Sequence, residues 1–143
     1  MMRPKKGIFR SGTSNVEVPE RNKAAFPEAF RTKSHLEYYA SLFNSVEINR
    51  TFYKLPLPSL VLHDMPMSGK GKLPMEADFI FKRYHGPRGD YKGSYSPAFL
   101  KKEAAGITAW LGQGKDVYAY FNNTAEGDAP KDVRMINQLI NEK

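Results

Sequence analysis

The stretch DFIFKRYHGP, residues 78–87, predicts a β-strand that ends at a turn. Aromatic and β-branched residues dominate its first half, and the glycine-proline pair at its end is a strong turn signal. A helix is predicted next, because Ser96 supplies an N-cap and Pro97 a first-turn proline ahead of an apolar pattern that reaches Trp110. Val117–Phe121 then predicts another strand. This order of elements indicates a largely parallel sheet.

The alternation of strands and helices continues on both sides of this stretch. Ser34 and Glu37 form a capping-box pattern ahead of apolar residues at helical spacing. The remaining predictions are strands over Lys6–Ser14, Ser45–Tyr53 and Leu60–His63, an irregular segment over Asn15–Lys33, loops over Met65–Ala77 and Arg88–Tyr95, and a last helix over Pro130–Ile140. The whole pattern favours the α/β fold class.

Length and composition limit the classes of protein to which the chain can belong. It has 143 residues, a net charge of +7 and no cysteine. This length favours a single domain and excludes a complete eight-unit β/α barrel, which needs roughly 200 residues at minimum. Without cysteine there is no disulfide, thiolate metal site or iron–sulfur cluster. No apolar run approaches the roughly 18 residues of a membrane span, so we expect a cytoplasmic protein without a membrane partner.

Polar side chains gather where several of the predicted strands end. In parallel α/β folds the ligand site lies at the carboxyl ends of the strands, although the same residue types also form turns and helix caps. His85 is the candidate for proton transfer, because imidazole titrates near neutral pH. The predicted catalytic residues are His85, Asp64 and Glu47, and the predicted ligand-binding residues are Asn49, Tyr53, Arg83, Tyr91, Asn122 and Asn123. No ligand spacing predicts a metal, and no cofactor is expected.

Several runs of the sequence carry a resemblance to a known family. They are YYASLFNSVEINRTFYKLP (residues 38–56), RYHGPRGDYKGSY (83–95) and DVYAYFNNTAEGDAPKD (116–132), with shorter matches at GTS (12–14) and LVLHDMPMS (60–68). Together they resemble the signature segments of the YecE-like family, a domain of unknown function, in the family's order and over most of the chain. The resemblance implies a TIM-type β/α barrel fold and no settled biochemical activity.

The chain departs from the family pattern in its middle. Residues 1–56 resemble the N-terminal part of the family and residues 57–143 the C-terminal part, so the central strands of the barrel are missing. We therefore expect a single shortened domain, a partial TIM-type barrel of about five mostly parallel strands. In chain numbering, the strand order would be third, fourth, fifth, first, second. Such an open sheet exposes two edges, which favours a homo-oligomer.

These observations favour a small anionic or phosphorylated ligand at the strand carboxyl ends. If the chain is an enzyme, acid/base or hydrolytic chemistry fits, with Asp64 or Glu47 orienting His85 and Arg83 holding negative charge. One alternative is a non-catalytic protein that binds nucleic acid through its basic surface, with affinity that falls steeply with salt. The other is an inactive, internally deleted barrel fragment.

Overall fold

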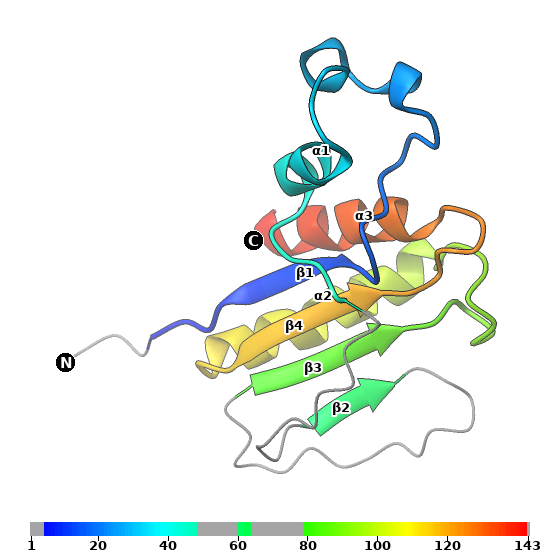
Figure 1. Ribbon diagram of the computed structural model, residues 1–143. Coiled ribbons are helices and arrows are strands. Elements are labelled where there is room, and N and C mark those ends of the chain that lie inside the picture. The colour runs from blue at the N-terminus through cyan, green and yellow to red at the C-terminus, as the bar shows by residue number, and fades with distance from the viewer. Residues whose placement is uncertain (1–4, 49–59, 64–78, 143) are drawn as a thin grey trace.

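The computed structural model of the protein describes residues 5–48, 60–63 and 79–142. Within these residues, four parallel strands form one sheet in the order β1-β4-β3-β2 (Figure 1). The strands are β1 (Phe9–Thr13), β2 (Leu60–His63), β3 (Phe79–Tyr84) and β4 (Asp116–Phe121). The helices are α1 (His35–Leu42), α2 (Pro97–Gly112) and α3 (Ala129–Asn141), together with the short 3-10 helices η1 (Lys23–Ala25) and η2 (Glu28–Phe30).

Two of the helices begin where their sequence signals predict. The Ser34 hydroxyl accepts a hydrogen bond from the Glu37 amide and the Glu37 carboxylate accepts one from the Ser34 amide, which confirms the capping box of α1. Ser96 caps α2 by accepting from the Phe99 amide, with Pro97 in the first turn. None of the helices in the described ranges is long and apolar enough to cross a bilayer.

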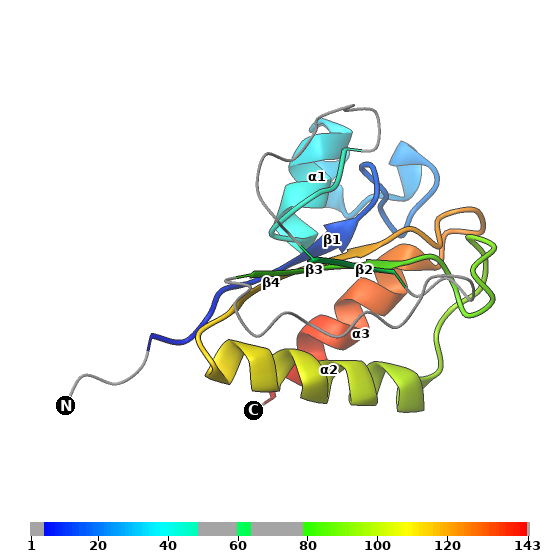
Figure 2. The same ribbon diagram turned by 90° about the horizontal axis from the view of Figure 1, so that it is seen from below.

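The sheet has one face covered by two helices. Figure 2 shows α2 and α3 side by side against this face, while α1 lies on the opposite side, near β1. Alternate residues of β4 point into the covered face, and Val117, Ala119 and Phe121 are fully buried there. They pack in one cluster with apolar residues of the helices, among them Ile107 of α2 and Ile136 of α3. Each such side chain contributes roughly 1.5–3 kcal/mol of burial free energy, so this layer holds the strand ends in place.

The observed strand order agrees with the predicted order for the four described strands. The predicted fifth strand, Ser45–Tyr53, is represented in the described residues by an isolated parallel bridge between Glu47 and Ser14. The Glu47 amide donates to the Thr13 carbonyl at 3.1 Å, and the Asn15 amide donates to the Glu47 carbonyl at 2.8 Å. The described residues therefore contain four strands and this bridge, which lies beside β1 where the fifth strand was expected. The rest of that predicted strand, residues 49–53, lies outside the described residues.

Candidate functional site

The four parallel strands all end at the same edge of the sheet, and the loops that follow them gather there (Figure 1). The bridge at Glu47 extends this carboxyl edge beyond Ser14, the residue that follows β1. Arg83 reaches the same edge from β3, where it stands in register with Tyr120 of β4 and His63 of β2. The carboxyl edge is the usual place for a ligand site in a parallel α/β fold.

Three side chains at this edge, Ser14, Glu47 and Arg83, form a cluster that we call the strand-end cluster. The Arg83 guanidinium binds the Glu47 carboxylate through two nitrogens, with Nε 2.8 Å from Oε1 and Nη2 3.1 Å from Oε2. The Ser14 hydroxyl donates a hydrogen bond to the same Oε2. The two charged side chains are 23% and 14% exposed, so solvent screens their attraction only in part. Both oxygens of the Glu47 carboxyl group are thus occupied by partners within the cluster.

A chain of hydroxyl groups connects β1 and β4 beside this cluster. The Tyr39 hydroxyl accepts from the Thr13 amide and donates to the Ser45 carbonyl, each at 2.8 Å. The hydroxyls of Ser45 and Tyr120 lie 2.6 Å apart. The backbones approach closely here, because a Cβ atom at Gly12 would stand 1.9 Å from the Ser45 carbonyl oxygen. Burial raises the pKa of both tyrosines, so their hydroxyls keep their protons and the chain stays intact at neutral pH.

His85 occupies a different environment, below the loop that follows β3. Its side chain is only 2% exposed, and its ring meets the Tyr91 ring edge to face with centroids 5.5 Å apart. The Tyr91 amide donates to the His85 carbonyl at 2.7 Å, and Tyr91 has a positive φ of 64°. The ring of Tyr91, 42% exposed, thereby covers the imidazole.

Asn123 and Asp132 form a second polar group, after β4 and in the first turns of α3. Asn123 is fully buried, and its Nδ2 donates to Asp132 Oδ2 at 2.7 Å and to the Gly93 carbonyl at 2.8 Å. Asp132 also accepts from the Ser94 hydroxyl and from the Tyr95 amide. Burial raises the pKa of Asp132, and the hydrogen bonds from Ser94, Asn123 and Tyr95 oppose that rise. This group ties the loop after β3 to the start of α3.

The structure thus brings some of the predicted site residues together and separates others. Glu47 and Arg83 are in direct contact, and so are the rings of His85 and Tyr91. The contacts of Asn123 given above are with residues outside the predicted set. Asn122 is nearly buried after β4, and its amide donates to the Tyr84 carbonyl. Asn49, Tyr53 and Asp64 lie outside the described residues. The roles assigned to these residues stay predictions.

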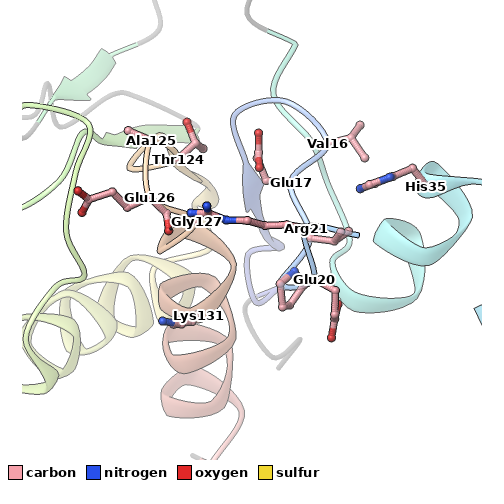
Figure 3. Close-up of a pocket in the computed structure, with 12 residues that line it drawn as sticks. Val16, Glu17, Glu20, Arg21, His35, Thr124, Ala125, Glu126, Gly127 and Lys131 are labelled. Carbon is pink, nitrogen blue, oxygen red and sulfur yellow. Dashed lines mark hydrogen bonds between the residues drawn. The ribbon is translucent and has the colours of Figure 1, made fainter. Parts of the chain in front are cut away.

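A cleft opens at the carboxyl edge beyond the strand-end cluster, between the loop after β1 and the loop after β4 (Figure 3). Its volume of about 480 Å³ is within the range of small-molecule sites. We call it the β1–β4 cleft. It is lined by Val16, Glu17, Val18, Pro19, Glu20, Arg21, His35, Thr124, Ala125, Glu126, Gly127 and Lys131.

Arg21 connects the two walls of the β1–β4 cleft. In Figure 3 its side chain extends from the loop after β1 to the loop after β4. There Nη2 donates to the Glu126 carbonyl at 3.0 Å, and the guanidinium lies against Gly127. An anion in the cleft would therefore meet a guanidinium that is already positioned by one hydrogen bond.

Glu17 is the acidic side chain whose proton affinity the cleft changes most clearly. Burial raises its pKa, and the charges of His35 and Arg21 oppose that rise. Its backbone amide is held by the Asn15 carbonyl at 3.0 Å and by Thr13 Oγ1 at 3.3 Å. Its carboxylate accepts no hydrogen bond from any residue in the described ranges. A partly buried carboxyl group without such a partner is available to a ligand.

The twelve lining residues include none of the nine predicted site residues. The segment Asn15–Lys33 carries no regular periodicity, so sequence reasoning assigned it no chemistry. The signal that could have found it is positional, because Glu17 and Arg21 lie in the loop that follows a strand of a parallel sheet. Three or more metal-ligating side chains do not come together anywhere in residues 5–48, 60–63 and 79–142.

Comparison with known proteins places the chain in a family. The sequence model described as "Protein of unknown function DUF72" matches residues 10–61 and residues 57–143. The chain belongs to the DUF72 family. The resemblance to YecE-like proteins agrees with this assignment, since that name fits DUF72. Membership brings no activity with it, because the family's function is itself unknown.

The chain is also similar to part of one solved structure of the same family. The chain is similar to a DUF72 family protein from Enterococcus faecalis V583, with 19% sequence identity and a TM-score of 0.46. The similar region covers 58% of this chain and 37% of that protein, so the chain spans less than half of its length. No curated protein matches significantly.

Proposed function

We propose that this DUF72 protein binds a small anionic ligand in the β1–β4 cleft. The observation that carries the proposal is the position of Arg21, which lies across a cleft of about 480 Å³ at the carboxyl edge of the sheet. Its guanidinium can offer paired N–H donors to a phosphate or carboxylate group. Lys131, 73% exposed on the first turn of α3, places a second cation at the rim, 3.7 Å from the Asp128 carboxylate. The net charge of +7 favours the approach of anions.

In our proposal the strand-end cluster does not compete for the ligand. Two nitrogens of the Arg83 guanidinium contact the Glu47 carboxylate, which also accepts a hydrogen bond from the Ser14 hydroxyl. Because these groups compensate one another, the anion-binding role passes to Arg21 in our proposal. We further propose that the fold is a shortened TIM-type barrel, in which residues 1–56 and 57–143 correspond to the two ends of the family domain. The two segments matched by the family model, which meet at residues 57–61, support this view.

Substitution of Arg21 tests the proposal. We expect inorganic phosphate, sulfate or a sugar phosphate to shift the amide NMR signals of the two loops that line the cleft. Arg21→Gln should weaken that binding by about tenfold or more, because a hydrogen bond to a charged group contributes roughly 1.5–3 kcal/mol. Arg88→Gln is the matched control, since Arg88 is 77% exposed and does not line the cleft.

Two results would contradict the proposal. One is anion binding that Arg21→Gln and Arg88→Gln weaken equally, which indicates a diffuse surface effect. The other is binding of single-stranded oligonucleotides with a steep salt dependence and no effect of Arg21→Gln, which favours the nucleic-acid alternative.

A further inference from the structure

The β1–β4 cleft is lined by a partly buried carboxyl group, that of Glu17. Glu17 lies in the loop after β1 and lines the cleft, on the same side as His35 in Figure 3. The hydrogen bonds of its backbone amide to Asn15 and Thr13 fix the position of the residue. The side chain is partly buried and lines the cleft, so it belongs to the site.

Among the acidic side chains that line the cleft, Glu17 is the one we expect to interact with a bound anion. The charged and titratable groups that face the cleft are Glu20 and Arg21 from its own loop, His35 from α1, Glu126 from the loop after β4 and Lys131 from α3. Glu20 accepts a hydrogen bond from the Tyr38 hydroxyl at 2.7 Å. The Glu126 side chain points away from the other lining side chains in Figure 3.

An ionised carboxylate and an anion in one small cleft repel each other, and the repulsion is strong where solvent is partly excluded. A proton on Glu17 removes the negative charge and turns the carboxyl group into a hydrogen-bond donor to the anion. Burial already makes this protonation easier than in water, and no hydrogen bond from the described residues holds the ionised form. Asp132 differs, because three hydrogen bonds stabilise its ionised form.

We propose that the β1–β4 cleft binds its anionic ligand together with a proton, and that Glu17 is the group that holds this proton. The inference rests on the proposed anion-binding function of the cleft. Linkage makes the coupling reciprocal, so the bound anion raises the pKa of Glu17 further, and a lower pH tightens anion binding.

Sulfate is the probe for the experiment, because it stays a dianion across the range from about pH 4.5 to about pH 8 in which carboxyl groups with a raised pKa titrate. Its affinity is measured by NMR titration for the wild type, Glu17→Gln and Glu28→Gln. Glu17→Gln should bind sulfate about tenfold more tightly than the wild type at the upper end of this range, and the two should converge at the lower end. Glu28→Gln makes the same change of charge outside the cleft, at an exposed position in η2, and should follow the wild type throughout.

The outcomes separate this inference from the function on which it rests. Sulfate binding with a constant ratio between Glu17→Gln and the wild type at every pH overturns the proton coupling and leaves the anion site in place. Failure of all three proteins to bind sulfate, phosphate or a sugar phosphate overturns both. A direct readout is the pKa of Glu17 from its side-chain carbon signal, which should rise when sulfate is added; an unchanged or lowered value overturns the inference.

Discussion

Asp132 and Glu17 are two carboxyl groups with raised pKa values at the same edge of the sheet, and their surroundings differ. Asp132 is 2% exposed and accepts hydrogen bonds from Ser94, Tyr95 and Asn123. Glu17 is partly buried, and its carboxylate has no hydrogen-bond partner within the described ranges. The first group is satisfied by the fold and holds two loops together, whereas the second keeps its hydrogen-bonding capacity for a ligand. Proton affinity alone therefore does not distinguish a structural carboxyl group from a functional one.

Removal of the Asp132 side chain tests the structural half of this comparison and should have the largest effect. Asp132→Ala leaves the Asn123 amide group and the Tyr95 backbone amide without their buried acceptor, at a cost of roughly 1–3 kcal/mol for each donor. We expect a loss of about 3 kcal/mol in the free energy of unfolding, measured by urea denaturation. The exposed Asp90→Ala should lose less than about 0.5 kcal/mol. A loss as small for Asp132→Ala would show that the network is dispensable.

Disruption of the strand-end cluster should have an intermediate effect on stability, because its charged side chains are partly exposed. Arg83→Met leaves Glu47 with only the Ser14 hydroxyl among the contacts of the cluster, and we expect a loss of about 1–2 kcal/mol in the free energy of unfolding. The double variant with Glu47→Gln should lose less than the sum of the two single variants, since they share one interaction. Strict additivity in the urea measurements would show that the pair contributes nothing to stability.

The smallest expected effects are on the pH dependence of stability, which compares the two carboxyl groups directly. Because the folded-state pKa of Asp132 is raised, its contribution is fully present below its ordinary pKa of 3.8 and is lost as the pH rises through the raised value. Asp132→Asn removes this pH dependence, since an amide does not ionise. Ionisation of Glu17 should likewise lower the free energy of unfolding of the wild type as the pH rises above the ordinary pKa of 4.5, and Glu17→Gln removes this loss. The effect should be only a few tenths of a kcal/mol, because solvent screens a partly exposed group. Urea denaturation across pH checks both as the difference between each variant and the wild type, because Glu37, whose pKa is lowered, contributes with the opposite sign in all three proteins. A difference that does not change with pH contradicts the prediction.

Local signals in the sequence predicted the elements with good agreement, because each signal acts over a few residues. Ser34 with Glu37 and Ser96 with Pro97 begin helices where expected. The predicted strands over residues 60–63, 78–85 and 117–121 are present within a residue or so of their bounds. The irregular reading of residues 15–33 also agrees with the structure, which has only two short 3-10 helices there.

The candidate site was harder to predict, because its partners are far apart in the chain. Glu47 and Arg83 were both named from their places near strand ends, and they do meet. The pairing of Arg21 with the Glu126 carbonyl joins residues 105 positions apart, and neither belongs to a periodic pattern or a motif. The localisation in the cytoplasm, the homo-oligomer and the catalytic role of His85 stay predictions.

The sequence by itself determined the α/β class, the places where α1 and α2 begin, the family and the concentration of polar residues at the strand ends, because these depend on local spacing and composition. Only the tertiary structure decided which polar groups compensate one another and which are left for a ligand. Glu17, Glu47 and Asp132 are all carboxylates near the carboxyl edge of one sheet, and only their burial and their hydrogen-bond partners distinguish them. Those partners come from loops that follow different strands, and the folded chain alone brings them together.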